Sequence, residues 1–322
     1  MRAAVATVLS GLLLGQSTLQ YVRTRTNDGT HCLRWPVAAG ARGRVTFVQS
    51  AQGLPALGSG VFDAVSRSAQ PWQAQLQACG NLDLAEGNRS ASRDIGYVQG
   101  GPNENLILFR SRVCSPLVPP GDPCVAAGDC GNAYDCWDHA SNIVALTTSS
   151  YATDSGELLD ADVEINAATG FPTIVDAPPC TQGAISTSCV ANDVQNAATH
   201  ELGHFLGLAH APDPSSTMYA SEPLGETSKR VLDSGSKQFV CDVYPAGHAS
   251  NDCTMEPGGS SSSGCTAAPQ TGSATPLLAL LLGGLALRRR RSDRQPARGG
   301  GPCPILGFAV PCPPPPEPGR GV

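Results

Sequence analysis

Three histidines and one glutamate stand at the spacing that a catalytic metal site requires. They belong to the run Thr199-His-Glu-Leu-Gly-His-Phe-Leu-Gly-Leu-Ala-His210. On a helix, His200 and His204 share one face because they are four residues apart. Gly207 can adopt a left-handed conformation at no steric cost, so the helix can end there and the turn can bring back His210 as a third ligand.

These residue types favour zinc. Three neutral imidazoles hold zinc and leave its fourth tetrahedral position open for water, as a catalytic site needs. Zinc lowers the pKa of that water to about 7, and Glu201, beside the ligands, can take the proton as general base. The same carboxyl group can then pass the proton to a leaving amine. The motif therefore predicts a working hydrolase with Glu201 as its catalytic residue.

The run also resembles the signature of the metzincin metallopeptidases, H-E-x-x-H-x-x-G-x-x-H with a later methionine turn. The stretch Ser216-Thr-Met-Tyr219 lies where that turn belongs, and its Met-Tyr order is similar to that of the matrixins. The resemblance implies that Met218, followed by Tyr219, forms a hydrophobic floor beneath the imidazoles. A tyrosine ligand two places after the methionine is not expected, because Ala220 stands there.

The resemblance covers roughly residues 21–247 and extends to a final helix at Ser234–Pro245. Matrixins usually carry an acidic pair near the start of that helix, and Gly235 and Ser236 stand there instead. Asp233 is the carboxylate that could substitute. The implied fold is an α/β (α+β) metzincin-like zincin, with a five-stranded twisted mixed sheet and the active-site helix above the cleft and a small C-terminal subdomain with one helix below it.

The patterns of apolar residues supply elements for such a fold. They predict strands at 44–49, 82–84, 105–110, 143–148 and 158–166, and a helix at 59–78 that Pro71 could kink or divide. Tyr151–Glu157 reads as a hairpin turn, and in the strand that follows it apolar and polar residues alternate. By resemblance, 143–148 is the edge strand above the cleft, which could pair with an extended peptide.

An acidic cluster follows the hairpin turn: Asp154, Glu157, Asp160 and Asp162. Carboxylates so close in sequence could hold a structural calcium ion. A solvated turn explains the same residues equally well, so both interpretations remain open.

The cysteines favour disulfides. Residues 21–264 contain ten of them: Cys32, Cys79, Cys114, Cys124, Cys130, Cys136, Cys180, Cys189, Cys241 and Cys253. An even number in an exported chain predicts up to five disulfides, with Cys180 and Cys189 as local partners. Two alternatives stay open: a second zinc site at Cys124, Cys130 and Cys136, and Cys32 as a thiolate that caps the catalytic zinc.

The N-terminus resembles an export signal. Arg2 precedes an apolar run at 3–14, and small residues at Gly15 and Ser17 suit a cleavage site. We therefore expect a signal peptide at 1–17, with a buried N-terminal helix as the alternative, and a catalytic domain at 18–247.

The C-terminal region changes in composition after residue 247. A Gly/Ser-rich linker at 248–275 contains Cys265, and an apolar helix with an arginine cluster follows at 276–291. Together these features resemble the sorting signals of myxobacterial surface proteins, in which processing near the cysteine leaves the protein on the cell surface. The alternative is an ordinary membrane anchor. The Pro/Gly-rich tail at 292–322 has no core-forming pattern, which predicts disorder. A proline-rich ligand for another protein and a wrongly extended reading frame are the two interpretations of this tail.

The net charge is −6, and no basic stripe runs through the globular part, so nucleic acid is not an expected partner. Our leading hypothesis is a monomeric, exported, surface-anchored zinc endopeptidase, with peptide or protein substrates and a processing enzyme as partners. A catalytically inactive zinc-binding adhesion module is the rival, although a purely structural site has no need of Glu201. A zinc hydrolase of non-peptide amides is a third possibility.

Overall fold

The computed structural model describes residues 21–253 and the two-residue segment 310–311. Apart from a two-residue strand described below, its main sheet has five strands: β2 (Gly43–Gln49), β3 (Leu82–Glu86), β4 (Asn105–Arg110), β5 (Ala145–Tyr151) and β6 (Leu158–Asn166). They lie in the order β5-β6-β4-β2-β3, and only β5 runs antiparallel to its neighbour. The predicted mixed α/β fold with a five-stranded mixed sheet is confirmed.

The edge strand β5 begins and ends later than predicted. It starts at Ala145 and runs to Tyr151, where the antiparallel register with β6 shifts. A further two-residue strand, β10 (Val310–Pro311), pairs in parallel with Ser150 and Tyr151. Among the described residues, the outer edge of β5 is therefore open from Ala145 to Ser149.

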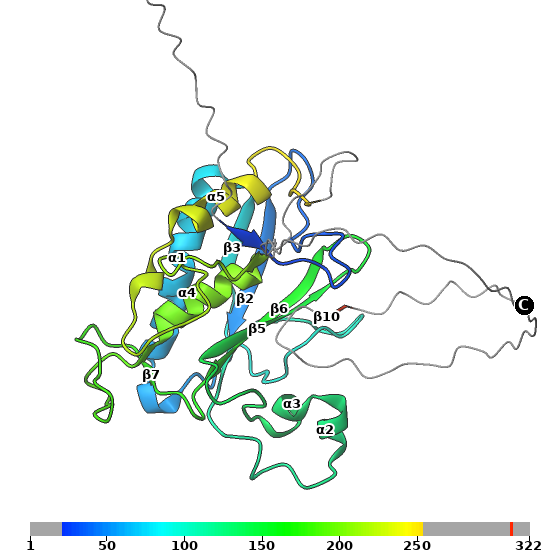
Figure 1. Cartoon of the computed structure of the whole chain (residues 1–322). Coiled ribbons are helices and arrows are strands. Elements are labelled where there is room, and N and C mark those ends of the chain that lie inside the picture. Colours follow the sequence, from blue (N-terminus) through cyan, green and yellow to red (C-terminus); the bar gives the residue numbers. More distant parts are fainter. Residues whose placement is uncertain (1–20, 254–309, 312–322) are drawn as a thin grey trace, which may run out of the picture. The chain divides into compact units, whose positions relative to one another are not determined.

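Three long helices lie together (Figure 1): α1 (Gly60–Cys79), α4 (Val194–Phe205) and α5 (Ser234–Val243). Helix α1 packs against β3, α4 and α5, and α4 packs against β5 and β6. Helix α1 continues through Pro71, which does not divide it. Its buried face carries apolar residues at helical spacing, among them Val61, Val65 and Trp72.

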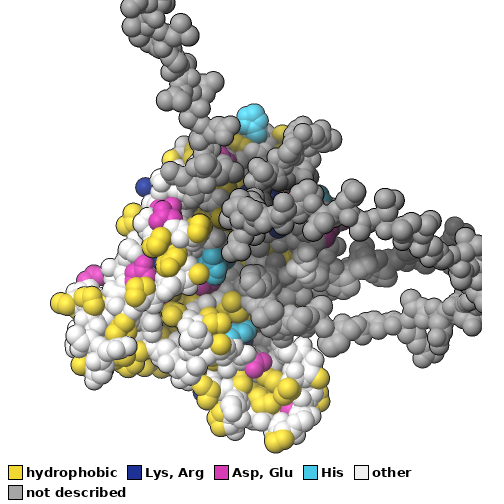
Figure 2. Space-filling view, in the orientation of Figure 1, with side chains coloured by type: hydrophobic (Ala, Val, Ile, Leu, Met, Phe, Trp, Pro, Cys, Tyr) yellow, Lys and Arg dark blue, Asp and Glu magenta, His cyan; other side chains and the backbone are white. Residues whose placement is uncertain are grey.

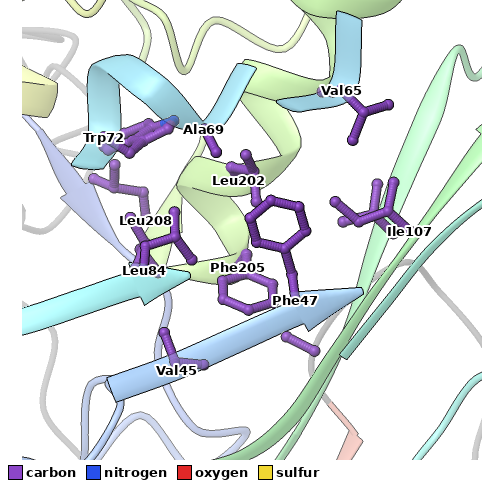
Figure 3. Packing of buried hydrophobic residues seen from close by; sticks show 14 of the residues in the cluster. Val45, Phe47, Val65, Ala69, Trp72, Leu84, Ile107, Leu202, Phe205 and Leu208 are labelled. Carbon is purple, nitrogen blue, oxygen red and sulfur yellow. The ribbon is translucent and has the colours of Figure 1, made fainter. Parts of the chain in front are cut away.

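The hydrophobic core lies between the sheet and helices α1 and α4 (Figure 3). Phe47 of β2 and Ile107 of β4 meet Leu202 and Phe205 of α4, while Trp72 comes from α1. The Trp72 indole N–H donates a hydrogen bond to the Thr199 carbonyl at 2.9 Å. The buried face of helix α4, which carries His200 and His204, thus packs against the hydrophobic core.

Residues 111–142 follow β4 and include a Pro/Gly/Cys-rich stretch at 114–139, whose composition predicts an irregular loop; the structure differs from that prediction. The segment contains two short helices, α2 (Pro123–Ala127) and α3 (Cys130–Tyr134). The Asp122 side chain caps α2 by accepting the Cys124 N–H at 2.9 Å. These helices have five residues each, too few to show a helical period in the sequence.

Buried ion pairs attach this segment to the sheet. Fully buried Arg110 of β4 donates to Glu164 of β6 at 2.6 Å and to Asp135 of the loop at 3.0 Å. His139 contacts the other Glu164 oxygen at 3.1 Å. The polar face of β6 is thus covered by protein.

Short elements complete the fold. Strand β1 (Val22–Arg23) pairs with β9 (Leu208–Ala209), and β7 (Pro172–Thr173) pairs with β8 (Asn192–Asp193). Two 3-10 helices are present, η1 (Pro55–Leu57) and η2 (Ser228–Arg230). The β1–β9 pair places the N-terminal segment against the turn that leads to His210.

All ten cysteines of the described region form disulfides: Cys32–Cys253, Cys79–Cys241, Cys114–Cys136, Cys124–Cys130 and Cys180–Cys189. The expected Cys180–Cys189 pair is confirmed. Both alternatives are wrong, because disulfide sulfurs supply no thiolate for a second zinc site or for a Cys32 cap. Five disulfides are typical of an extracellular protein.

Within the described residues, no helix has the length and apolar character needed to cross a bilayer. The predicted signal peptide at 1–17, Cys265 and the apolar helix at 276–291 lie outside the described residues. So does the tail at 292–322, apart from β10.

Candidate metal centre

Helix α4 delivers the first two histidines. It begins after Asp193, whose side chain caps it by accepting the Asn196 N–H at 2.8 Å. It ends at Phe205, two residues before Gly207, which has a φ of 105°. A Cβ at Gly207 would also lie 2.4 Å from the Leu33 carbonyl oxygen. The turn after the helix therefore needs glycine both for its conformation and for its close contact with the N-terminal segment.

The structure brings together His200, His204 and His210, whose ligand nitrogens all lie within 4.8 Å of one another. His200 is buried, His204 is half-buried and His210 is exposed, so the group opens to solvent on one side. The ring centroids are 4.6–5.2 Å apart. Among the described residues this is the one His/Cys/Asp/Glu group able to hold a metal ion.

Hydrogen bonds fix which nitrogens face the centre. The Nδ1 atoms of His200 and His204 each lie 2.7 Å from a backbone carbonyl oxygen, that of Thr217 and Leu208 respectively. A carbonyl only accepts, so each Nδ1 carries the hydrogen and each Nε2 is an acceptor in the neutral ring.

The two Nε2 atoms nevertheless face each other at 3.2 Å. Lone pairs at this separation repel unless a cation lies between them. Two nitrogens bound to one tetrahedral zinc ion at 2.0–2.1 Å would be about 3.4 Å apart. The donor set, its tautomers and its spacing therefore fit zinc.

Electrostatics keep these rings neutral. Burial, followed by the positive charge that His204 would carry, lowers the pKa of His200 well below its usual value. Burial also lowers the pKa of His204, partly offset by its hydrogen bond to Leu208. Neutral imidazole is the form that binds a metal ion.

Glu201 is buried beside the three histidines. Burial raises the pKa of its carboxyl group to about 7, although a hydrogen bond from Thr147 and the nearby Lys229 charge both lower it. The Thr147 hydroxyl, on edge strand β5, donates to Glu201 Oε2 at 2.6 Å. A carboxyl group poised near neutral pH suits a general base.

The methionine turn lies under the helix. Met218 is 1% exposed, and a Cβ added at Gly203 would lie 2.2 Å from its sulfur. Gly203 therefore lets Met218 pack directly against α4 between the two helical histidines. The neighbouring Thr217 supplies the carbonyl that orients His200.

Asp233 supports this turn, as the candidate substitute for the missing acidic pair. Its Oδ1 accepts the Thr217 N–H at 3.1 Å, and its own N–H donates to Thr217 Oγ1 at 3.0 Å. Asp233 also caps α5 through Gly235. Burial raises the pKa of this carboxyl group, but hydrogen bonds from Ser236, Thr217 and Gly235 bring it below the usual value.

A cavity of about 530 Å³ adjoins the histidines. One wall is edge strand β5 with the residues before it, and the opposite wall is the 219–222 segment, which includes Tyr219 and Ala220. Histidine side chains reach the surface in Figure 2, with more acidic than basic groups on the coloured part of that face. An extended chain could lie along β5 with one side chain in the cavity.

The four acidic residues of the hairpin region do not form a comparable group. Asp160 and Asp162 are buried in β6, which rules out a solvated turn for these two, and Glu157 lies 3.9 Å from Arg34. Among the described residues, no three of these carboxylates form a group that could hold a metal ion. A structural calcium ion stays a prediction.

Sequence reasoning missed several residues of the site. Thr147, Glu222 and Lys229 line the cavity, and Gly203 accommodates Met218. The glycine stood within the quoted motif, where its small size was a usable signal. The other three belong to the site only through tertiary contacts.

Comparison with known proteins bears on this centre. Residues 130–244 match the matrixin family of peptidases. The match spans the edge strand, the three histidines, the methionine turn and the final helix, and it supports a matrixin-like, zinc-dependent metallopeptidase. No curated protein matches the chain significantly in sequence.

Proposed function

We propose that this protein is an exported, surface-anchored zinc endopeptidase in which His200, His204 and His210 bind the metal and Glu201 is the general base. The observation that carries the proposal is the pair of acceptor nitrogens facing each other at 3.2 Å, with a buried glutamate at their side and an open cavity in front. The matrixin match supports the same reaction class.

Bound by the three imidazoles, zinc would supply a Lewis acid that polarises a peptide carbonyl and makes a water molecule acidic enough to attack at neutral pH. The protein's own residues do the rest. Glu201 accepts a proton from the attacking water and donates it to the nitrogen of the leaving amine. Thr147 holds the Glu201 carboxyl group in place through its hydroxyl group.

The substrate is a peptide or protein segment in extended conformation. The open edge of β5 offers main-chain donors and acceptors beside the cavity, and a bound peptide would add a strand there. This geometry favours a peptide over a small non-peptide amide, which could not use the edge. The protein acts as a monomer.

The reaction is tested by incubating purified protein with a mixed peptide library, with and without a zinc chelator, and reading the cuts by mass spectrometry. We expect one zinc per chain by elemental analysis, and cuts that disappear with the chelator and return with added zinc. Stoichiometric zinc without any cut would favour the zinc-binding adhesion module instead.

Anchoring is a separate part of the proposal. In the native host, a processing enzyme cleaves near Cys265, removes the 276–291 segment and leaves the mature protein on the cell surface. Mass spectrometry of the surface fraction should find no peptide covering 277–287, and Cys265→Ser should keep the precursor uncut. Finding those peptides in mature protein would favour an ordinary membrane anchor.

A further inference from the structure

The cavity beside the histidines ends in a group of charged residues. Lys229 and Glu222 both line it. The Lys229 side chain is 3% exposed, and its ammonium group donates to the Ser221 carbonyl at 2.7 Å and to Glu226 at 3.2 Å. The buried cation is therefore already paired with the Glu226 carboxylate.

Glu222 has no such partner among the described residues. Its Oε1 atom is shielded from solvent and makes no hydrogen bond. The Nδ2 atom of Asn196 is likewise shielded from solvent and makes no hydrogen bond. Asn196 is close enough to favour the ionised form of Glu222, but neither atom completes a bond. A buried acceptor left unpaired is destabilising, and a bound donor would remove that cost.

The charges around this end of the cavity do not balance. Arg230 pairs with Asp193 and Asp176, both at 2.6 Å, and Lys229 pairs with Glu226. Arg67 also acts on Asp176, so that with Glu222 added three cations face four carboxylates. The group lacks positive charge, and Glu222 is the member without an ion pair.

The pKa of Glu222 agrees with this picture. Burial raises it to about 8, Lys229 and Asn196 lower it, and Glu226 and Asp193 raise it further. A cation brought by a substrate would reverse part of the burial effect and stabilise the carboxylate.

The cavity accepts the side chain of the substrate residue that directly follows the cleaved bond. Glu201 lines it and, in the function proposed above, returns a proton to the leaving nitrogen. That nitrogen belongs to the residue directly after the cleaved bond, so this residue lies closest to Glu201. Its side chain is the substrate group that can enter the cavity.

We propose that Glu222 makes this cavity select substrates with lysine or arginine directly after the cleaved bond. The inference rests on the proposed peptidase function and adds its substrate class. A basic side chain would donate to the unpaired Glu222 oxygen and supply the missing positive charge. An apolar side chain would leave that oxygen unpaired, and an acidic one would add a fifth carboxylate.

The test starts from the best-cut sequence of a peptide library and varies only the residue after the cleaved bond. Peptides with lysine, arginine, leucine, glutamine and glutamate there are compared by kcat/KM. We expect the lysine-to-leucine ratio of the parent protein to exceed about 10, and Glu222→Gln to lower that ratio by about 10-fold or more. Glu222→Ala, which cannot accept a hydrogen bond, should lower it at least as much.

Asp176→Asn is the matched control. It removes the same charge from the same group, but Asp176 is 88% exposed and does not line the cavity. Its lysine-to-leucine ratio should equal that of the parent, and circular dichroism establishes that each variant is folded. A parent ratio near 1, which needs no variant to measure, would overturn the proposal, as would a ratio unchanged in both Glu222 variants.

Failure of the inference is distinct from failure of the proposed function. If no peptide in the set is cut in the presence of zinc, the peptidase function fails. If peptides are cut without preference for lysine or arginine, the peptidase stands and the role of Glu222 is wrong.

Discussion

At the scale of single residues, the site separates metal binding from proton transfer. In the proposed function the three histidines bind the metal and Glu201 transfers the proton, although His200, Glu201 and His204 lie on neighbouring positions of the same helix. Replacing a histidine should therefore abolish zinc binding, whereas replacing Glu201 should abolish only the proton transfer.

The Glu201→Gln variant should retain its zinc ion and its folded structure. Its kcat/KM should fall by about 10²–10⁴-fold, because the amide cannot take the proton. His204→Ala should lose zinc as well, since two ligands remain. Zinc content by elemental analysis and peptide cleavage distinguish the two. Cleavage by the glutamine variant at the parent rate would remove Glu201 from the mechanism.

Thr147→Val keeps the shape of the side chain but removes the hydroxyl group that donates to Glu201 at 2.6 Å. A donor to the ionised form lowers a pKa, so its loss should raise the pKa of Glu201 and move the acidic limb of the kcat/KM profile to higher pH. Activity at pH 7 should fall about 3- to 10-fold. Thr148→Val, one residue along on the other face of β5, should leave the profile in place. An identical profile for both variants would exclude this role for Thr147.

The sequence could reveal the candidate metal ligands and the candidate base because their spacing within one helix and one turn is a local property. His200, Glu201, His204, Gly207 and His210 were all found in this way. Thr147 and Glu222 could not be found, because threonine in a strand and glutamate in a loop carry no signal until the chain folds. Thr147 donates to Glu201, which lies 54 residues away in the chain, and Glu222 lines the cavity together with His200, which lies 22 residues away.

At the scale of elements, strand β6 differs most from its sequence pattern. Alternation predicted one apolar and one polar face, and in the structure both faces are buried. At Glu164 the polar face is covered by the 111–142 segment, whose two short helices carried no periodic signal, and at Asp162 it is contacted by Gly96. The boundaries of β4 and β6 agree with the sequence prediction, because runs of buried apolar residues mark them.

Asp160 and Asp162 give this buried face a pH dependence. Burial raises the pKa of Asp160; burial and then the Asp160 charge raise that of Asp162. The folded state thus holds protons more tightly than the unfolded state, so the protein loses stability as pH rises above the ordinary aspartate range. Asp160→Asn should remove the repulsion and raise the free energy of unfolding at pH 8 by about 1–2 kcal/mol, with little change at pH 4.

Urea unfolding at both pH values, in EDTA, measures this effect. Lower stability of the variant at pH 8 would contradict the repulsion argument. Repeating the measurement with calcium tests the remaining metal prediction, because a calcium ion held by these carboxylates would stabilise the parent and not the variant.

At the scale of the whole molecule, disulfides connect segments that are distant in the chain. Cys79–Cys241 joins the end of α1 to α5 across 162 residues, whereas Cys124–Cys130 closes only 6. The entropy of loop closure predicts that the long bridge stabilises more, by about 3 kcal/mol. We expect Cys79→Ser/Cys241→Ser to lower the free energy of unfolding accordingly more than Cys124→Ser/Cys130→Ser. Equal losses in urea titrations would mean that native contacts, rather than chain entropy, dominate.

The Cys180–Cys189 bridge has a consequence for a peptidase that shares its surroundings with other copies of itself. The residues it encloses, 181–188, are all exposed, and exposed loops are where proteases cut first. A cut inside this loop would leave both halves covalently joined by this bridge and by Cys32–Cys253 and Cys79–Cys241, with the histidine helix still attached to the sheet. Aged preparations should then show one band on a non-reducing gel and two after reduction, while activity persists. Cleavage of one copy by another within this loop would therefore break the chain without separating the two fragments.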